Sequence, residues 1–406
     1  MPGPFTIGFG RNRHQMNEKH VISTGRARAS VLALLLLCGF CLSCSGSGRP
    51  VKAGADPYWD DLARYLAGMP VREDSPFRPA TLHAFYRSHV NTMNTFWDMV
   101  LKETVEKVAP WRAAHLPEMR RGAVAFYPFS GADLVNLYTF FPGARVYLLI
   151  ALEEPGPIPE PLALPPWRLA QSLVSLQRSI WSIAADNYFK SGLMQKELYN
   201  HTMEGITPLL LIFAARLDLR VVRVERVGLN GSGEVMSLDR DGLLDGARPA
   251  VTGTRLHVLA QGDRAPRTVT YLRMKLHDSV LDESIPEGMF FKKLGRLNVL
   301  IKSAVYLLHR GSFADICRYL LDRSTVICQD DSGIPFRYFS GGTWDMKLFG
   351  TYTYPRRLKD LPDPPYQPDL AAEYARSSLP LPFDYGYGVL DGKGRSNLLC
   401  AVKHGR

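Results

Sequence analysis

Apolar residues recur at helical spacing soon after a polar stretch that ends near residue 57. Residues 58–66 place aromatic and leucine side chains at helical intervals, and residues 81–108 carry a longer apolar and aromatic stripe on one side. Pro110 follows, and we expect it to end the second helix because proline lacks an amide donor. Such a stripe either packs on a core or lines a ligand groove, and packing is its usual role. The pattern predicts a helical cover over residues 58–120.

A strand, a turn, a helix and a second strand follow this cover. Residues 123–127 and 146–152 are almost wholly apolar, as buried strands are, and the helix over residues 133–141 stops at Pro142. Two strands around one short helix favour parallel pairing. The pattern predicts an α/β fold with a Rossmann-like, methyltransferase-like parallel-core sheet.

The rest of the chain shows shorter patterns. A strand with one solvent-exposed face is expected at residues 219–229. The proline-rich loop at 154–166 can form the lip of a pocket. We also expect helices at 167–189, 207–217, 297–308 and 312–322, a hairpin of strands 255–261 and 268–276, a strand at 325–329, and a closing antiparallel hairpin of strands 383–389 and 397–402.

The beginning of the chain has the layout of a secretory leader. Arg26 and Arg28 precede an apolar run at residues 29–42 that is too short to span a membrane comfortably. A translation start at Met16 would give this leader an ordinary length. The layout predicts export, so that the folded body lies outside the cytoplasm.

Cys44 follows the apolar run and precedes small residues, as the lipidated cysteine of a bacterial lipobox does. Cys41 stands where that motif usually has leucine. We expect a protein of the cell envelope, facing the periplasm or the surface, that is anchored to the membrane by a lipid on Cys44; plain cleavage and a retained anchor are the alternatives. Residues 1–44 are then the leader, 45–57 a flexible tether and 58–406 a single α/β domain.

Composition and charge narrow the class of partner. The chain has 406 residues, of which 46% are hydrophobic and 22% charged, a composition that suits a globular core. The formal net charge is +10, but five basic residues and one acidic residue before Cys44 contribute +4, which leaves +6 for the remainder. We therefore expect no nucleic-acid partner, because much of the positive charge belongs to the leader.

Cysteine and histidine usage indicates no metal site. After Cys44 only Cys317, Cys328 and Cys400 remain, without CxxC spacing, and the histidines are scattered. One disulfide with a spare thiol and three buried thiols are both open at this point.

The first candidate site is the turn between the two apolar strands. Ser130, Gly131 and Asp133 occupy this turn, where free amide groups and a helix N-terminus can bind a polar ligand. Glu153 closes the second strand, where a carboxylate can accept hydrogen bonds from ribose hydroxyls. Over some thirty residues this order resembles the cofactor half of class I S-adenosylmethionine methyltransferases. The turn has a single glycine, and the alternative is a scaffold turn in which Ser130 and Asp133 cap a helix.

The second candidate site is the acidic turn after the strand at 325–329. Adjacent carboxylates repel unless a cation, a base or ligand hydroxyls hold them, so such pairs recur at binding sites. The alternating oxygen ligands of a calcium loop are missing, and a plain solvated turn is the alternative. The candidate residues are Gln329, Asp330, Asp331 and Ser332.

The motifs together resemble a family of exported bacterial proteins, many of them lipoproteins. The resemblance rests on YPFSGAD, the FFP before the second strand, QDDSGIP, LPFDYGYG and SNLL, and it covers most of the chain after about residue 55. It implies a shared fold and two motif-bearing loops, but no reaction.

We therefore expect a small polar ligand to bind in a cleft between the SGAD and QDDSG loops, because the C-terminal ends of parallel strands point to one edge of the sheet. One alternative is a degenerate transferase or a hydrolase that uses Glu153, Asp330 or Asp331. The other is a cell-envelope interaction protein without a ligand pocket. The sequence leaves the cofactor and the oligomeric state open.

Overall fold

A computed structural model describes residues 56–118, 122–186, 203–339, 341–353, 365–387 and 396–405. The predicted leader, its start and Cys44 lie outside these residues. All described residues belong to one compact unit that runs from Lys52 to Arg406.

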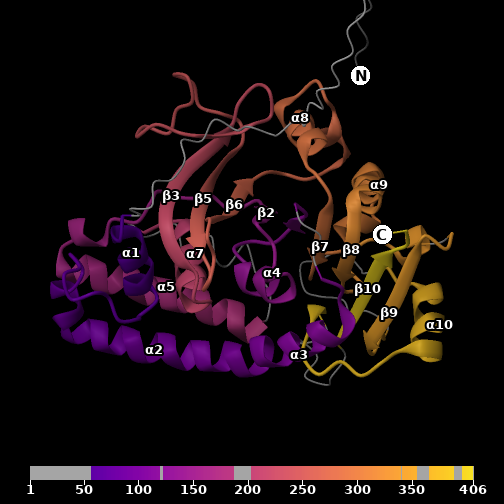
Figure 1. Cartoon of the computed structure of the whole chain (residues 1–406), viewed down its shortest axis with the longest axis horizontal. Helices are drawn as coiled ribbons and strands as arrows, with labels where there is room; N and C mark the ends of the chain where they lie inside the picture. The colour runs from indigo at the N-terminus through magenta and orange to yellow at the C-terminus, as the bar shows by residue number, and fades with distance from the viewer. Residues whose placement is uncertain are drawn as a thin grey trace, which may run out of the picture. The chain divides into compact units, whose positions relative to one another are not determined.

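The architecture is mixed α/β, as predicted, and is built on a ten-stranded sheet (Figure 1). The strands are β1 (Val124–Pro128), β2 (Val146–Ala151), β3 (Arg220–Leu229), β4 (Val235–Ser237), β5 (Thr252–Leu259), β6 (Arg267–Arg273), β7 (Leu297–Ile301), β8 (Ser324–Gln329), β9 (Trp344–Gly350) and β10 (Asn397–Lys403). Their order across the sheet is β4-β3-β5-β6-β2-β1-β7-β8-β10-β9.

The centre of the sheet is parallel. β1 pairs with β2 in the predicted parallel sense, with Val124 opposite Val146, and with β7 on its other side. β6 and β8 extend the parallel set outward, and the strands beyond them pair antiparallel. The five parallel strands lie in the order β6-β2-β1-β7-β8 across the sheet, which is 3-2-1-4-5 when they are numbered along the chain. The chain therefore adds strands first on one side of β1 and then, from β7, on the other side, so the direction of winding reverses between β1 and β7.

Helices cover both faces of the sheet because alternate strand residues point to opposite sides. In β1, Ala125 and Tyr127 belong to one apolar cluster and Val124 and Phe126 to the other. The first cluster includes α1 (Tyr58–Leu66), α2 (Ala84–Val100), α3 (Glu106–His115), α4 (Leu134–Phe140), α5 (Pro166–Asp186) and α7 (Thr207–Arg216); the second includes α8 (Pro286–Lys293), α9 (Ala314–Arg323) and α10 (Pro368–Ser377).

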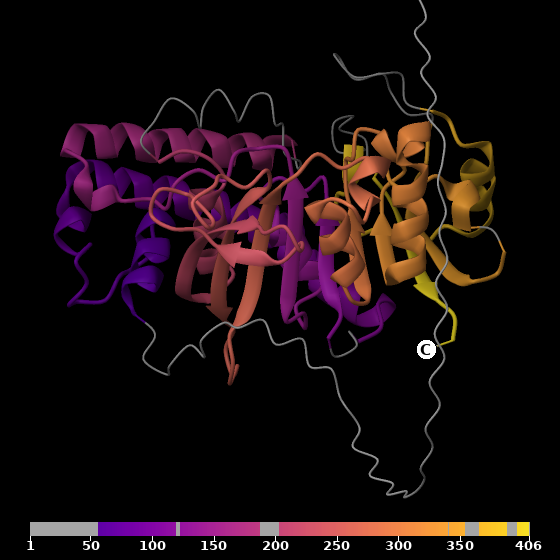
Figure 2. The same ribbon diagram turned by 90° about the horizontal axis from the view of Figure 1, so that it is seen from above.

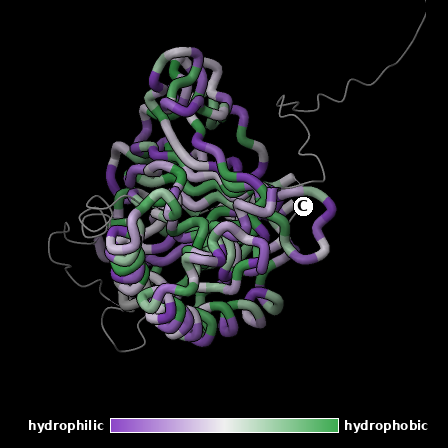
Figure 3. Tube along the Cα trace, turned by 90° about the vertical axis from the view of Figure 1, so that its left-hand side faces the viewer, coloured by the Kyte–Doolittle hydropathy of each residue, from purple (hydrophilic) through white to green (hydrophobic). Residues whose placement is uncertain are grey.

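The long helices α2 and α5 lie next to each other on the first face (Figure 2). Hydrophobic segments run through the middle of the molecule (Figure 3). The aromatic stripe of α2 therefore packs on the core, with Tyr86, Met93 and Phe96 buried. Among the described helices, none is long and apolar enough to cross a membrane.

Several predicted elements are confirmed. The predicted helices at 207–217 and 312–322 correspond to α7 and α9, and the predicted hairpin to β5 and β6. The strand predicted at 219–229 corresponds to β3. Glu225 lies on the face that was expected to be exposed to solvent, but it is buried, and its Oε2 lies 2.7 Å from His257 Nε2. The helix expected at 167–189 begins at Pro166, and its predicted end lies outside the described residues.

The helix predicted at residues 297–308 is wrong. Leu297–Ile301 is the buried central strand β7, and the chain then turns through residues 302–306 into a short 3-10 helix, Leu307–His309. A short apolar run has no periodicity that separates a buried strand from a buried helix, and here the parallel sheet supplies partners on both sides.

Two other expectations also fail. Pro110 lies inside α3 rather than ending the preceding helix, which continues through a π-helical turn at Leu101–Val105. The closing hairpin is wrong because residues 383–387 form no strand, and residues 388–389 lie outside the described part. β10 pairs instead with β8 and β9, which precede it by more than forty residues.

Candidate functional site

The predicted site residues lie in loops that leave one edge of the sheet. β1, β2 and β8 are codirectional, so Ser130, Asp133, Glu153 and Asp330 follow the C-terminal ends of their strands at that edge. The loop after β7, residues 302–306, lies between those of β1 and β8 in the strand order. The edge thus brings together the two predicted loops and a third loop that the sequence did not indicate.

The turn after β1 is held by its own groups. The Ser130 amide donates to Ile150 O at 3.1 Å, and its hydroxyl donates to Gly131 O at 3.0 Å. Asp133 caps α4 by accepting a hydrogen bond from the Asn136 amide at 3.1 Å. The capping alternative therefore describes Asp133 but not Ser130.

Glu153 is buried, with 2% of its surface exposed. Tyr271 donates its hydroxyl to the backbone oxygen of Glu153 at 2.7 Å and only distantly to Oε2, at 3.4 Å. Oε1 has no hydrogen-bond partner among the described residues. A buried carboxylate oxygen without a donor is costly, which makes Glu153 the predicted residue that is best prepared to accept a hydrogen bond from a ligand.

Asp330 is 1% exposed and fastens the loop after β7. Its carboxylate accepts hydrogen bonds from the Ser303 amide at 2.9 Å and from the Ser332 hydroxyl at 2.5 Å. Ser332 Oγ in turn accepts from the Ala304 amide at 2.7 Å. The alternative of a solvated turn is therefore wrong for Asp330, because the backbone of a neighbouring loop replaces water.

Asp331 is also buried, at 7% exposure, and is held by side chains from two other segments. Tyr306 donates to Oδ2 at 2.8 Å and Asn397 Nδ2 donates to Oδ1 at 2.9 Å. The Asp331 amide donates to Asn397 Oδ1 at 2.8 Å, so this contact is reciprocal. Gln329 closes the turn on itself through two hydrogen bonds with the backbone of Ile334.

Burial raises the pKa values of both carboxyl groups of the acidic pair. Desolvation, followed by the neighbouring charge of Asp331, raises the pKa of Asp330 to about 7. Burial also raises the pKa of Asp331, against the hydrogen bonds from Asn397 and Tyr306. The pair therefore favours holding a proton near neutral pH.

Lys302 brings a positive charge to this edge. Its side chain is 1% exposed, and Nζ lies 4.0 Å from Asp133 Oδ2. Burial lowers the pKa of Lys302, while the charges of Asp133 and Asp330 oppose that shift. Lys302 therefore joins the SGAD and QDDSG loops electrostatically.

The loop that carries Lys302 is strained. Ser303, Val305 and Tyr306 have φ values of 54°, 55° and 52°, a left-handed conformation that side chains rarely adopt. The loop persists because Asp330, Ser332 and Tyr387 accept its amide hydrogens. Ser303 Oγ is buried and has no partner in the described part of the chain. Strain of this kind is typical of functional sites.

The sequence reasoning missed Lys302, Ser303 and Tyr306 because it placed them in a helix. The signal that could have found them is the apolar run LNVLI followed directly by a lysine. A strand there would have placed Lys302 at the sheet edge beside the other two loops.

The side chains of the two predicted loops are largely buried. Ser130, Asp133, Gln329 and Ser332 are at most 5% exposed, and the hydrogen bonds described above connect the acidic loop to protein groups. A cavity of about 450 Å³ lies on the β2 and β6 side of the sheet and is lined by none of the predicted residues. Its lining includes Glu154, the neighbour of Glu153 in the sequence, and Arg273 at the end of β6.

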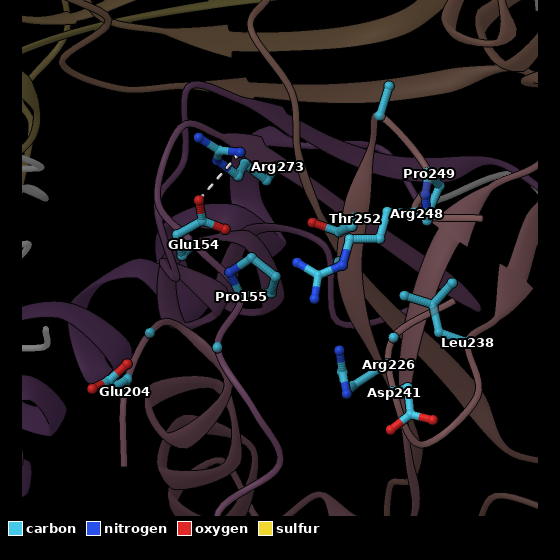
Figure 4. A pocket seen from close by; sticks show the side chains of 15 residues that line it. Glu154, Pro155, Glu204, Arg226, Leu238, Asp241, Arg248, Pro249, Thr252 and Arg273 are labelled. Atoms are coloured by element: carbon cyan, nitrogen blue, oxygen red, sulfur yellow. Dashed lines mark ion pairs between the residues drawn. The ribbon is translucent and has the colours of Figure 1, made fainter. Parts of the chain in front are cut away.

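The side chains of this cavity are mainly polar (Figure 4). Arg273 forms an ion pair with Glu154 at 3.2 Å. Arg226 and Arg248 direct their guanidinium groups toward the middle of the cavity and form no ion pair within the described residues. Glu204 and Asp241 line its rim. The proline-rich loop contributes Pro155, so it does form a pocket lip.

Comparisons of the chain with family models, with curated protein sequences and with solved structures give no match. Within the described residues no group of three or more His, Cys, Asp or Glu side chains is arranged to hold a metal ion. The function must therefore be argued from the geometry of this sheet edge.

Proposed function

We propose that the chain has a Rossmann-like core, methyltransferase-like in layout, and binds a small polar ligand at the C-terminal edge of its parallel strands. The strand order 3-2-1-4-5 supports this proposal, because folds with that order bind ligands in the crevice where the winding reverses. Here the reversal falls between β1 and β7, whose loops carry Ser130 and Ser303.

The unpartnered Oε1 of Glu153 is the observation that carries the proposal. Glu153 follows β2, the strand next to β1, and a ligand hydroxyl or amine would supply the donor that the protein lacks there. Another unpartnered atom at this edge, Ser303 Oγ, belongs to the loop after β7, the strand on the other side of β1. The ligand is therefore expected to carry hydrogen-bond donors.

The cavity beside Glu153 suggests the other end of the ligand. Arg226 and Arg248 converge on it without carboxylate partners, and guanidinium groups bind phosphate and carboxylate well. A hydroxyl-bearing molecule with an acidic group, such as a nucleotide or a sugar phosphate, combines both features.

The test is a thermal-shift panel of nucleosides, nucleotides, sugars, sugar phosphates and S-adenosylmethionine. A ligand at one hundred times its Kd stabilises the folded state by about 2.7 kcal/mol, which raises Tm by several degrees. Glu153→Gln removes the negative charge and one of the two acceptor oxygens, so we expect it to reduce the shift strongly. Without ligand its Tm should equal or exceed that of the wild type, because an unpaired buried carboxylate is removed.

Glu106→Gln is the matched control, since it removes an exposed carboxylate from α3; it should keep the full ligand-induced shift. The proposal is wrong if no compound raises Tm, or if Glu153→Gln responds as the wild type does.

The second candidate is an enzyme, and the buried Asp330–Asp331 pair beside Lys302 favours it. Perturbed acidity in a strained, buried cluster is typical of acid–base sites. A transferase would retain S-adenosylmethionine through purification, which mass spectrometry of the native protein detects. A hydrolase would lose turnover in Asp330→Asn while still binding its substrate.

A further inference from the structure

Cys328 and Cys400 lie directly opposite each other on the antiparallel strands β8 and β10. Their sulfur atoms are 3.3 Å apart, and both residues are at most 2% exposed. Cys317 lies on α9 in the other apolar cluster, where its thiol donates to Leu308 O. The three cysteines of the body are thus one facing pair and one separate thiol.

The backbone at this pair suits a covalent bond. Residues directly opposite on antiparallel strands have Cα atoms roughly 4.5 or 5.5 Å apart. A disulfide requires a separation of about 4.4–6.8 Å, so either kind of pair satisfies it without moving the strands. Side chains at opposed positions also point to the same face of the sheet, as the short sulfur–sulfur distance shows.

We propose that Cys328 and Cys400 form a disulfide in the mature protein and that Cys317 remains a thiol. The reaction is thiol–disulfide exchange with an external disulfide, either a small one such as oxidised glutathione or a dithiol oxidase of the envelope. One cysteine thiolate attacks the external disulfide and forms a mixed disulfide, and the second displaces the external sulfur. The two cysteines lose two protons and two electrons, and the external disulfide becomes two thiols.

The exchange belongs to folding rather than to the finished fold. Burial raises the pKa of the Cys400 thiol well above its ordinary range, so Cys400 holds little of the reactive thiolate in the folded reduced protein, and both sulfur atoms are closed off from an external disulfide. Before β10 docks, both thiols are accessible to the oxidant. The reduced folded protein should therefore be oxidised slowly.

The bond would fasten the last strand to the acidic loop. Cys328 stands two residues before Asp330, and Asn397, which holds Asp331, begins β10. Closing a loop of this length removes conformational freedom mainly from the unfolded chain, so reduction should lower Tm by roughly 5 °C.

The experiment compares full-length protein exported into an oxidising compartment with the same chain from reducing cytoplasm. Each sample is denatured, alkylated with a maleimide before or after reduction, and mapped by peptide mass spectrometry. We expect Cys317 to react without reduction in both samples. In the exported protein Cys328 and Cys400 should react only after reduction and should appear as one cross-linked peptide pair.

Matched alanine variants give the thermal readout. Reductant should lower Tm in the wild type and in Cys317→Ala, but not in Cys328→Ala or Cys400→Ala. If the last two variants do not fold, the alkylation map of the wild type still decides. The proposal is overturned if Cys328 and Cys400 of the exported protein are alkylated without reduction, also after refolding with oxidised glutathione.

Discussion

Single side chains at the sheet edge show how the protein tolerates adjacent buried carboxylates. Asp330 and Asp331 accept hydrogen bonds from different partners. Asp330 binds the backbone of the loop after β7, and Asp331 binds the side chains of Tyr306 and Asn397. Adjacent carboxylates in solution repel, so donors from the protein and the charge of Lys302 compensate here. The motif QDDSG therefore connects the loop after β7 and the start of β10 by hydrogen bonds, in addition to being a candidate site.

The raised pKa of Asp330 predicts that the stability of the protein depends on pH. Its pKa is about 7 in the folded protein against an ordinary 3.8, so the folded state binds the proton more tightly. The resulting stabilisation is complete below about pH 4 and is lost as the pH rises through 7. Asp330→Asn, which cannot ionise, lacks this loss. Between pH 5 and 8 the free energy of unfolding of the wild type, measured in urea, should fall by roughly 2–3 kcal/mol relative to this variant.

Asp369→Asn provides the comparison, because Asp369 is exposed in the first turn of α10. Its difference from the wild type should not change over the same pH range. A flat difference for Asp330→Asn as well would mean that Asp330 is not held in a proton-binding environment.

Two segments far apart in sequence cross at the corner between β2 and α7. The amides of Ile206 and Thr207 donate to the backbone oxygens of Glu154 and Pro155 at 3.1 and 3.0 Å. Gly156 has φ of 71°, and a Cβ atom there would lie 2.0 Å from Glu204 O. This corner positions Glu153 and one wall of the cavity, so it must admit close backbone contact.

Gly156→Ala is therefore expected to destabilise the protein by about 3 kcal/mol or more, because backbone atoms must move apart. Gly262→Ala is the matched control. Gly262 has φ of 81° but open space around its would-be Cβ, so only the conformational term of about 1–2 kcal/mol applies. Urea unfolding measures both. Equal losses would show that the two segments do not approach so closely.

The whole molecule combines a predicted leader with a ten-stranded sheet that helices cover on both faces. No helix within the described ranges is long and apolar enough to cross a membrane. Cys44 lies outside the described residues, and its lipid stays a prediction.

Labelling with a radioactive fatty acid tests that anchor. The full chain should take up label in a bacterial host, and Cys44→Ala should lose it because the acceptor sulfur is gone. Cys41→Ala keeps Cys44 and should still be labelled. Label that persists in Cys44→Ala would exclude Cys44 as the acceptor.

The sequence by itself determined the elements whose pattern is local. The stretch around the SGAD turn gave a strand, a capped helix and a parallel partner strand, because strong apolar runs and Pro142 leave few alternatives. The same reasoning found β8 and therefore placed Asp330 at the edge shared with Ser130.

Only the tertiary structure decided what local pattern leaves open. LNVLI is compatible with helix or strand, and partners on both sides, β1 and β8, make it a strand. That choice put Lys302 and Ser303 at the candidate site. The burial of Asp331 likewise depends on Asn397, 66 residues later. Such contacts arise from long-range packing, which periodicity along the chain does not encode.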